Sequence, residues 1–224
     1  MDIRKLIKEI LIEMAPPVGY LSTMDWYHGA SPDRVASIIN DGHLKPSDLV
    51  KKGSRSQMAP QFGKVYLTHD VVEGLGYAFF RAGSHMVVDK PIDKKAYLVV
   101  VDGGALKSVD PDEDIIADLI PDFPSNMENG KHKLQWLRDL ASRVAPKALQ
   151  KYEKMGDYAY GTALGKMLMK YLNDEQKIEL IVHGKKMAHG GEIPIKEVWE
   201  LDMSQKERYK SDPNGFREFS KRIH

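Results

Sequence analysis

Two short stretches, Trp26-Tyr27-His28-Gly29-Ala30 and Gly63-Lys64-Val65-Tyr66-Leu67-Thr68, decide the fold of this chain. Each has the pattern of a strand that leads into a helix. After the first, Ser31-Pro32-Asp33 supplies an N-cap, a proline at the first helical position and an acid in the first turn. Gly42 is a candidate left-handed cap at the end of that helix. After the second, residues 69–82 predict another helix, so the framework begins with two strand–helix units.

The rest of the chain adds strands and helices in irregular order. Tyr97–Asp102 is a near-continuous apolar run and predicts a buried strand. Residues 131–172 are mostly helical in pattern, and Pro146 interrupts them or opens a second helix. Late strands are predicted at 178–182, at 196–201 and, as a third candidate, at 185–188. Because strands and helices do not alternate regularly, the pattern favours an α+β fold over a doubly wound parallel sheet.

These segments predict one main domain with flanking pieces. Residues 1–17 are expected to form an amphipathic N-terminal helix that either packs on the domain or docks another chain. The main domain is expected over 20–202, with the helical insertion at 131–172. The polar residues 203–224 are expected to be a surface helix or a frayed tail. Residues 45–62 look like a loop of the length that often carries function.

Composition excludes several classes of function. The chain has 224 residues, 33 basic and 32 acidic, so its net charge of +1 supplies no strong field toward nucleic acid or an anionic membrane. It has no cysteine, which excludes disulfides, thiolate nucleophiles and cysteine-ligated zinc. We find neither a membrane-spanning apolar run nor a signal peptide, and expect a cytoplasmic protein.

Three side chains in the two opening motifs point to a binding cleft. His28 followed by Gly29, at a strand end before a helix, lets an imidazole and backbone face one pocket. Tyr66 and Tyr77, eleven residues apart, have the placement to clamp a flat heterocycle, with roughly 1 kcal/mol from each stacking contact. The structural alternative is a histidine bonded to a neighbouring carbonyl, and two ordinary amphipathic core tyrosines.

The order of motifs resembles the ADP-ribosyltransferase superfamily in its His-Tyr branch, which includes poly(ADP-ribose) polymerases, rifampicin ADP-ribosyltransferases and small bacterial and phage relatives. The resemblance covers about residues 25–201. It rests on Tyr-His-Gly-Ala, Gly-Lys-Val-Tyr-Leu-Thr, Gly76-Tyr77-Ala78 and the late turn Gly191-Glu192-Ile193-Pro194. It implies a split antiparallel β-sandwich with flanking helices. It also implies NAD as the substrate, no metal, and transfer of ADP-ribose to an acceptor with release of nicotinamide.

The resemblance assigns roles to particular residues. His28 would hold ribose, and nicotinamide would stack between Tyr66 and Tyr77. The polymerases place a carboxamide-binding serine eight residues after the strand tyrosine. Here that position is Gly74, so the carboxamide would rely on Gly29 or Thr68.

The catalytic acid of the family, a glutamate near the start of a late strand, has several candidates here. Glu192 and Glu179 rank equal, His189 follows, and Glu197 is also close. The acceptor is open among protein, nucleic acid, a small molecule and water.

Two other readings share the implied fold. One is an RNA 2′-phosphotransferase-like enzyme, which the near-neutral charge disfavours. The other is a non-catalytic NAD-binding, ADP-ribose-binding or structural protein, with the N-terminal helix as a docking element for a protein partner.

Among the remaining polar residues, His69-Asp70 is expected to cap a helix, and 109–114 to form an acidic turn that does not match a calcium loop.

Overall fold

The computed structural model describes residues 21–46, 63–83, 94–106, 109–120, 134–156 and 158–224. The chain divides into two compact units. The helical unit contains the described residues of Asp110–Met187, and the sheet unit contains those of Tyr20–Lys52, Pro60–Val109 and Ala188–His224. The predicted N-terminal helix at 1–17 and nearly all of the predicted loop at 45–62 lie outside the described residues.

The strands form a seven-stranded antiparallel sheet and a two-stranded one, which confirms the α+β class. The order of the large sheet is β5-β6-β3-β1-β4-β8-β9. The predicted strands at 64–68, 97–102 and 196–201 are observed with small shifts of their ends. The bounds are β1 Asp25–Ala30, β3 Lys64–Thr68, β4 Lys95–Asp102, β5 Asp110–Pro111, β6 Lys186–Gly190, β8 Glu197–Asp202 and β9 Lys221–Arg222, with β2 His43–Leu44 and β7 Ile193–Pro194 in the small sheet.

The helices after β1 and β3 begin and end at the residues that the sequence marks. Helix α3, Pro32–Asp41, has Ser31 as N-cap residue and ends at Gly42 in the left-handed conformation, with φ 67°. Helix α4, Val71–Gly83, follows Asp70, whose Oδ1 accepts the amide of Val72 at 2.9 Å. The cap predicted at His69-Asp70 is therefore formed by the aspartate.

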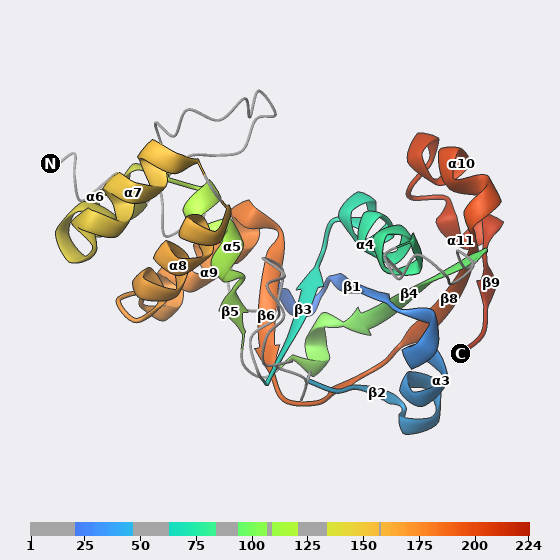
Figure 1. Ribbon diagram of the computed structural model, residues 1–224. Helices are drawn as coiled ribbons and strands as arrows, with labels where there is room; N and C mark the ends of the chain where they lie inside the picture. Colours follow the sequence, from blue (N-terminus) through green and yellow to red (C-terminus); the bar gives the residue numbers. More distant parts are fainter. Residues whose placement is uncertain (1–20, 47–62, 84–93, 107–108, 121–133, 157) are drawn as a thin grey trace, which may run out of the picture. The chain divides into compact units, whose positions relative to one another are not determined.

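Helix α4 lies directly on β1 because two glycines let the backbones meet (Figure 1). A Cβ on Gly29 would come within 2.4 Å of the backbone at Tyr77 and Ala78, and one on Gly74 within 2.6 Å of the Tyr27 Cβ. Around this contact the face of the sheet carries an apolar cluster shared by α4, β4 and β8, which includes Leu75, Phe79, Leu98, Val100, Trp199 and Leu201. The contact therefore sets how α4 is placed on the sheet.

The polar segment 203–224 is folded onto the sheet and is not a frayed tail. It forms a 3₁₀ turn at Met203–Gln205, α10 at Lys206–Ser211, α11 at Phe216–Phe219 and then β9, which pairs with β8. Tyr209 and Phe216 are each 1% exposed and belong to the apolar cluster under α4. The segment is polar on average, so its sequence gave no sign that these two aromatic residues are buried. Their burial fastens residues 203–224 to the sheet.

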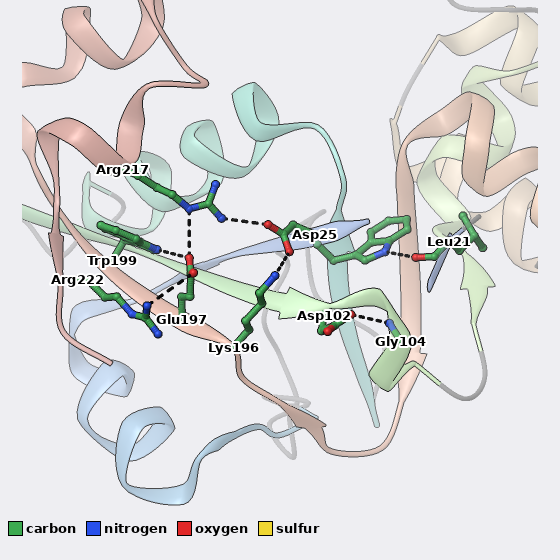
Figure 2. A network of polar contacts seen from close by, with 10 residues as sticks. Leu21, Asp25, Asp102, Gly104, Lys196, Glu197, Trp199, Arg217 and Arg222 are labelled. Carbon is green, nitrogen blue, oxygen red and sulfur yellow. Dashed lines mark hydrogen bonds and ion pairs between the residues drawn. The ribbon is translucent and has the colours of Figure 1, made fainter. Parts of the chain in front are cut away.

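A network of charges joins this segment to β1 and β8 (Figure 2). Arg217 donates from Nε to Glu197 at 3.2 Å and from Nη2 to Asp25 at 3.0 Å. Lys196 bonds the other Asp25 oxygen at 2.8 Å, and the Trp199 indole donates to Glu197 at 2.7 Å. Glu197 is thus a structural anchor, and its carboxylate is occupied by groups of the protein itself.

The helical unit is a separate bundle built mainly of five helices among its described residues. They are α5 Glu113–Asp118, α6 Gln135–Val144, α7 Pro146–Met155, α8 Tyr158–Met169 and α9 Asp174–Gly184. Pro146 stands at the start of α7, so it opens a second helix. The apolar core draws on all five helices, through Ile115, Ile116, Leu137, Leu140, Leu149, Tyr152, Leu164, Leu168 and Leu180.

Two predicted elements in this unit are wrong. Residues 178–182 are the middle of helix α9, because Asn173 and Gln176 form a complete capping box that starts a helix upstream of the apolar run. A short run rich in Ile, Leu and Val does not by itself separate strand from helix. The acidic turn expected at 109–114 is strand β5 followed by the first turn of α5, with Asp112 as its N-cap.

We predict that Gly74→Ala destabilises the protein while Gly76→Ala does not. Both glycines lie in α4, but a Cβ at Gly74 meets Tyr27, whereas at Gly76 it meets nothing within 4 Å. The first change should cost roughly 1–3 kcal/mol through overpacking, and the second should stabilise by roughly 0.5–1 kcal/mol through lower chain entropy. Chemical denaturation of both variants measures this, and equal effects would contradict the close α4–β1 contact.

We predict that Asp112→Asn stabilises the protein at pH 8 and has little effect at pH 4. Burial raises the pKa of Asp112 to about 7, although its carboxylate accepts the Asp114 amide at 2.9 Å. Since this folded pKa lies above the unfolded value, the stability contributed by the neutral acid is lost as pH rises from about 4 to about 7. Asparagine keeps the cap and removes the buried charge.

The expected gain for Asp112→Asn is roughly 1–3 kcal/mol at pH 8, measured by urea unfolding at several pH values. A difference between variant and wild type that does not change with pH would contradict the raised pKa of this carboxyl group.

Candidate functional site

The two opening motifs meet through one hydrogen bond. The Nδ1 atom of His28 on β1 lies 3.0 Å from the carbonyl oxygen of Tyr66 on β3. The two strands are antiparallel and are paired at Tyr27 and Thr68. If this register were extended by two residues, Gly29 would lie opposite Tyr66. The imidazole therefore adds a side-chain link between the two strands at this point. His28 and Tyr66 are thus directly linked, and the cleft that they were expected to share stays a prediction.

This bond defines the state of the His28 ring. A carbonyl oxygen only accepts, so Nδ1 carries the proton and Nε2 of the neutral ring is a hydrogen-bond acceptor. Burial lowers the pKa of His28, the positive charges of Arg81 and Arg34 lower it further, and the bond to Tyr66 acts in the opposite direction. The ring links two strands through its hydrogen bond to Tyr66. It is half-buried, so part of it is also accessible from the surface.

The tyrosines lie on the side of the sheet that α4 covers. Tyr27 and Gly29 contact α4, so strand alternation directs His28 to the other face. On β3, Thr68 bonds Glu73 of α4, and Tyr66 shares the face of Thr68. Tyr77 is in α4 itself and 39% exposed. Tyr66 and Tyr77 are therefore on one side of β3, and the facing of their rings stays a prediction.

The residues considered for binding the nicotinamide carboxamide are engaged in internal contacts of the fold. Gly29 was expected to admit a ligand, but the space beside its Cα is filled by the α4 backbone. Thr68 is 1% exposed, and its hydroxyl donates to Glu73 at 3.2 Å and accepts the Asp70 amide at 3.1 Å. Gly74, at the position of the serine in the motif that the sequence resembles, leaves no room for a Cβ against Tyr27. These three residues serve the packing of α4.

The glutamates named as catalytic acid lie in three different settings. Glu179 is in helix α9 of the helical unit and on no strand, 4.0 Å from the His183 ring. Glu192 is exposed and precedes β7, whose Ile193 pairs with Leu44. Glu197 is held by Arg217 and Trp199 (Figure 2). The reasons that made Glu179 a late-strand acid are therefore wrong, and Glu197 is engaged elsewhere.

His189 is the remaining candidate, and it lies on the strand next to β3. It lies on β6, the neighbour of β3, so β1, β3 and β6 bring His28, Tyr66 and His189 from three adjacent strands. Its side chain is 6% exposed, and its Nδ1 atom has no hydrogen-bond partner among the described residues. Burial lowers the pKa of His189, and the nearby Lys64 charge lowers it further, against a bond to Gly191. It is a neutral imidazole with a buried polar atom to satisfy.

Arg34 and Arg81 belong to no motif in the sequence, but their charges lower the pKa of His28. Their charges act on His28 from α3 and α4. Both residues lie in helices that the sequence predicts. Arg81 is one helical turn after Tyr77, and this spacing could have indicated that it lies near that tyrosine.

We predict that the two histidines make the protein less stable in mild acid. Each has a folded pKa below its unfolded value, so as pH falls below about 6.5 the unfolded chain gains protons that the folded chain does not. Stability should therefore fall between pH 7.5 and pH 5.5. His28→Asn and His189→Gln should each reduce that fall, as thermal melts at both pH values will show. An identical fall in both variants would contradict this.

The described residues contain no group of three His, Asp or Glu side chains placed to hold a metal ion. No helix in the described part of the chain has the length and apolar character needed to cross a membrane. Comparison of the chain with family models, with curated proteins and with solved structures found no match. The geometry around His28 is therefore the main indication of function.

Proposed function

We propose that the sheet unit binds NAD at the junction of β1 and β3 and transfers ADP-ribose to an acceptor, releasing nicotinamide. The observation that carries this proposal is the bond from His28 Nδ1 to the Tyr66 carbonyl at 3.0 Å. It couples the two motif strands and leaves Nε2 as an acceptor in a fixed orientation. A ribose hydroxyl is a donor that such an atom recognises.

Nicotinamide would stack on the aromatic faces of Tyr66 and Tyr77. Both residues are on the α4 side of β3, whereas His28 leaves β1 on the other side. A dinucleotide that reaches all three must bend around the end of the β1–β3 ladder, beyond the pair Tyr27–Thr68 and toward Gly29 and Tyr66. NAD would therefore be held in a bent form across that junction, with the glycosidic bond near the strand edge.

His189 is the third group of this proposal. In the transfer step the bond from ribose C1′ to the nicotinamide nitrogen breaks, and nicotinamide leaves with the bonding electrons. The acceptor's oxygen or nitrogen forms the new bond to C1′, and its proton passes to His189. The lowered pKa of His189 keeps the ring neutral and basic near pH 7, as this role needs. A neutral ring supplies no negative charge, so oxocarbenium stabilisation is weaker than from a carboxylate.

A binding module without catalysis is the second candidate. It is favoured by the placement of the carboxylates, since Glu179 is in α9, Glu192 is exposed and Glu197 is bonded to Arg217. An RNA 2′-phosphotransferase-like reaction is the third, and the two arginines that act on His28 are the feature it would use. Nicotinamide release separates transfer from binding alone.

We predict that wild-type protein releases nicotinamide from labelled NAD, and that His28 and His189 variants fail in different ways. His28→Asn keeps a donor for the Tyr66 carbonyl but removes Nε2, so NAD affinity should fall about tenfold with stability nearly kept. His189→Gln should lower turnover about 10²-fold or more at nearly unchanged affinity, as loss of a general base does. Calorimetric titration and single-turnover assays measure these effects.

The matched control is His43→Asn. The Nδ1 atom of His43 also bonds a backbone carbonyl, that of Asp41 at 2.9 Å, but this histidine is on β2 and outside the proposed site. It should bind and react as wild type. If wild type binds NAD and releases no nicotinamide with any acceptor in cell extract, the protein is a binding module. If His28→Asn leaves NAD affinity unchanged, His28 is structural.

A further inference from the structure

Helix α8 packs one side against α5 and α7 and leaves its other side exposed (Figure 1). A Cβ on Gly161 would come within 2.9 Å of the Tyr152 ring of α7, and one on Gly165 would overlap the Glu113 backbone of α5. These glycines therefore mark the inner side. Because residues four apart lie on one side of a helix, the outer side is marked by the exposed residues Ala159, Ala163, Met167 and, in the turn after α8, Tyr171.

This outer side carries large apolar side chains that the fold does not bury. Met167 is 48% exposed and Tyr171 is 56% exposed. Met155, the last residue of α7, precedes the start of α8 and is 55% exposed. Exposed apolar side chains that gather in one place mark interaction sites, and methionine adapts its shape to a partner. We call Met155, Ala159, Ala163, Met167 and Tyr171 the α8 strip.

Lysines border the α8 strip on both sides. Lys166 and Lys170 lie one turn apart on one edge, and Lys151 of α7 lies on the other edge, 4.2 Å from the centre of the Tyr160 ring. Lys166 is 3.8 Å from the buried Glu113, whereas Lys170 has no ion-pair partner in the described part of the chain. The exposed residues that the structure describes in 146–171 include five lysines and no carboxylate. The strip therefore lies in a positive local potential, although the whole chain is nearly neutral.

We propose that the α8 strip and its lysines dock an acidic amphipathic helix of a protein partner. The apolar face of that helix covers the strip, and carboxylates along its edges reach Lys151, Lys166 and Lys170. Helix α8 has 12 residues, so the strip is about 18 Å long and matches about three turns of the partner. The inference is independent of the proposed NAD site, because every residue it uses belongs to the helical unit.

The charge pattern favours this occupant over two others. A second copy of the chain, docked through the same strip, would bring lysines against lysines, which opposes association. Single-stranded nucleic acid satisfies lysines, but it is bound mainly by aromatic and arginine side chains on which bases stack. The large residues of the strip are two methionines and one tyrosine at its end, which suit the apolar ridge of a helix.

The test measures binding of a fluorescently labelled model peptide to the full chain by fluorescence anisotropy. The peptide is helical, with leucine along one face and glutamate along the other. Wild type should bind it in the micromolar range, and Met167→Ser and Lys170→Gln should each weaken binding about tenfold. The matched controls are Phe80→Ser, a 51% exposed apolar residue of α4, and Lys94→Gln, an exposed lysine of the sheet unit. Both controls should bind the peptide as wild type does.

Three further probes separate this partner from the alternatives: a peptide of the same composition in shuffled order, single-stranded RNA, and vesicles that contain phosphatidylserine. Much weaker binding of all three supports the inference. It is overturned if wild type does not bind the acidic peptide, if the shuffled peptide binds equally well, or if both strip variants bind as wild type does. Tighter binding of RNA or vesicles that the same variants lose also overturns it, as does a wild-type dimer in sedimentation that Met167→Ser dissociates. Melting temperatures close to wild type confirm that the variants are folded.

Discussion

The arrangement of the sheet unit depends on the close approach of α4 to β1. Gly29 and Gly74 remove the two side chains that would keep these backbones apart, and a Cβ at either position would come within 2.6 Å of its neighbour. Tight packing transmits such a constraint, because interiors contain little free volume. The position of α4 then fixes where Tyr77 and Arg81 lie along β1. One steric contact thus links the core of the sheet to the proposed NAD site.

His28 combines two roles that are usually treated as alternatives. Its Nδ1 completes the contact between β1 and β3, at 3.0 Å from the Tyr66 carbonyl, and so it is structural. The same bond orients the ring and leaves Nε2 as an acceptor, which is how supporting hydrogen bonds prepare histidines at functional sites. Replacement by alanine would therefore mix lost stability with lost binding, since the hydrogen bond to the Tyr66 carbonyl would be lost.

Some ionisable groups of the sheet unit serve the structure, and others are available for the proposed function. Asp25, Glu197 and Arg217 bond one another and fasten the C-terminal segment to β1 and β8 (Figure 2). His189 has instead a buried nitrogen without a partner among the described residues. A buried polar atom left unpaired is costly, and such costs are retained mainly where function requires them. This contrast is why His189, and none of the named glutamates, takes the third place in the proposed mechanism.

Local sequence determined the elements whose signals are short-range. Ser31-Pro32 and Gly42 bound α3, Asp70 caps α4, and alternating or continuous apolar runs mark β3 and β4, because caps and periodicity act within a few residues. Only the tertiary structure decided what those elements contact. It placed the side chains of Thr68 and Glu197 in internal hydrogen bonds, and it brought the His28 ring to the Tyr66 carbonyl. Burial, strand neighbours and charge proximity join residues far apart in the chain, and no local pattern encodes them.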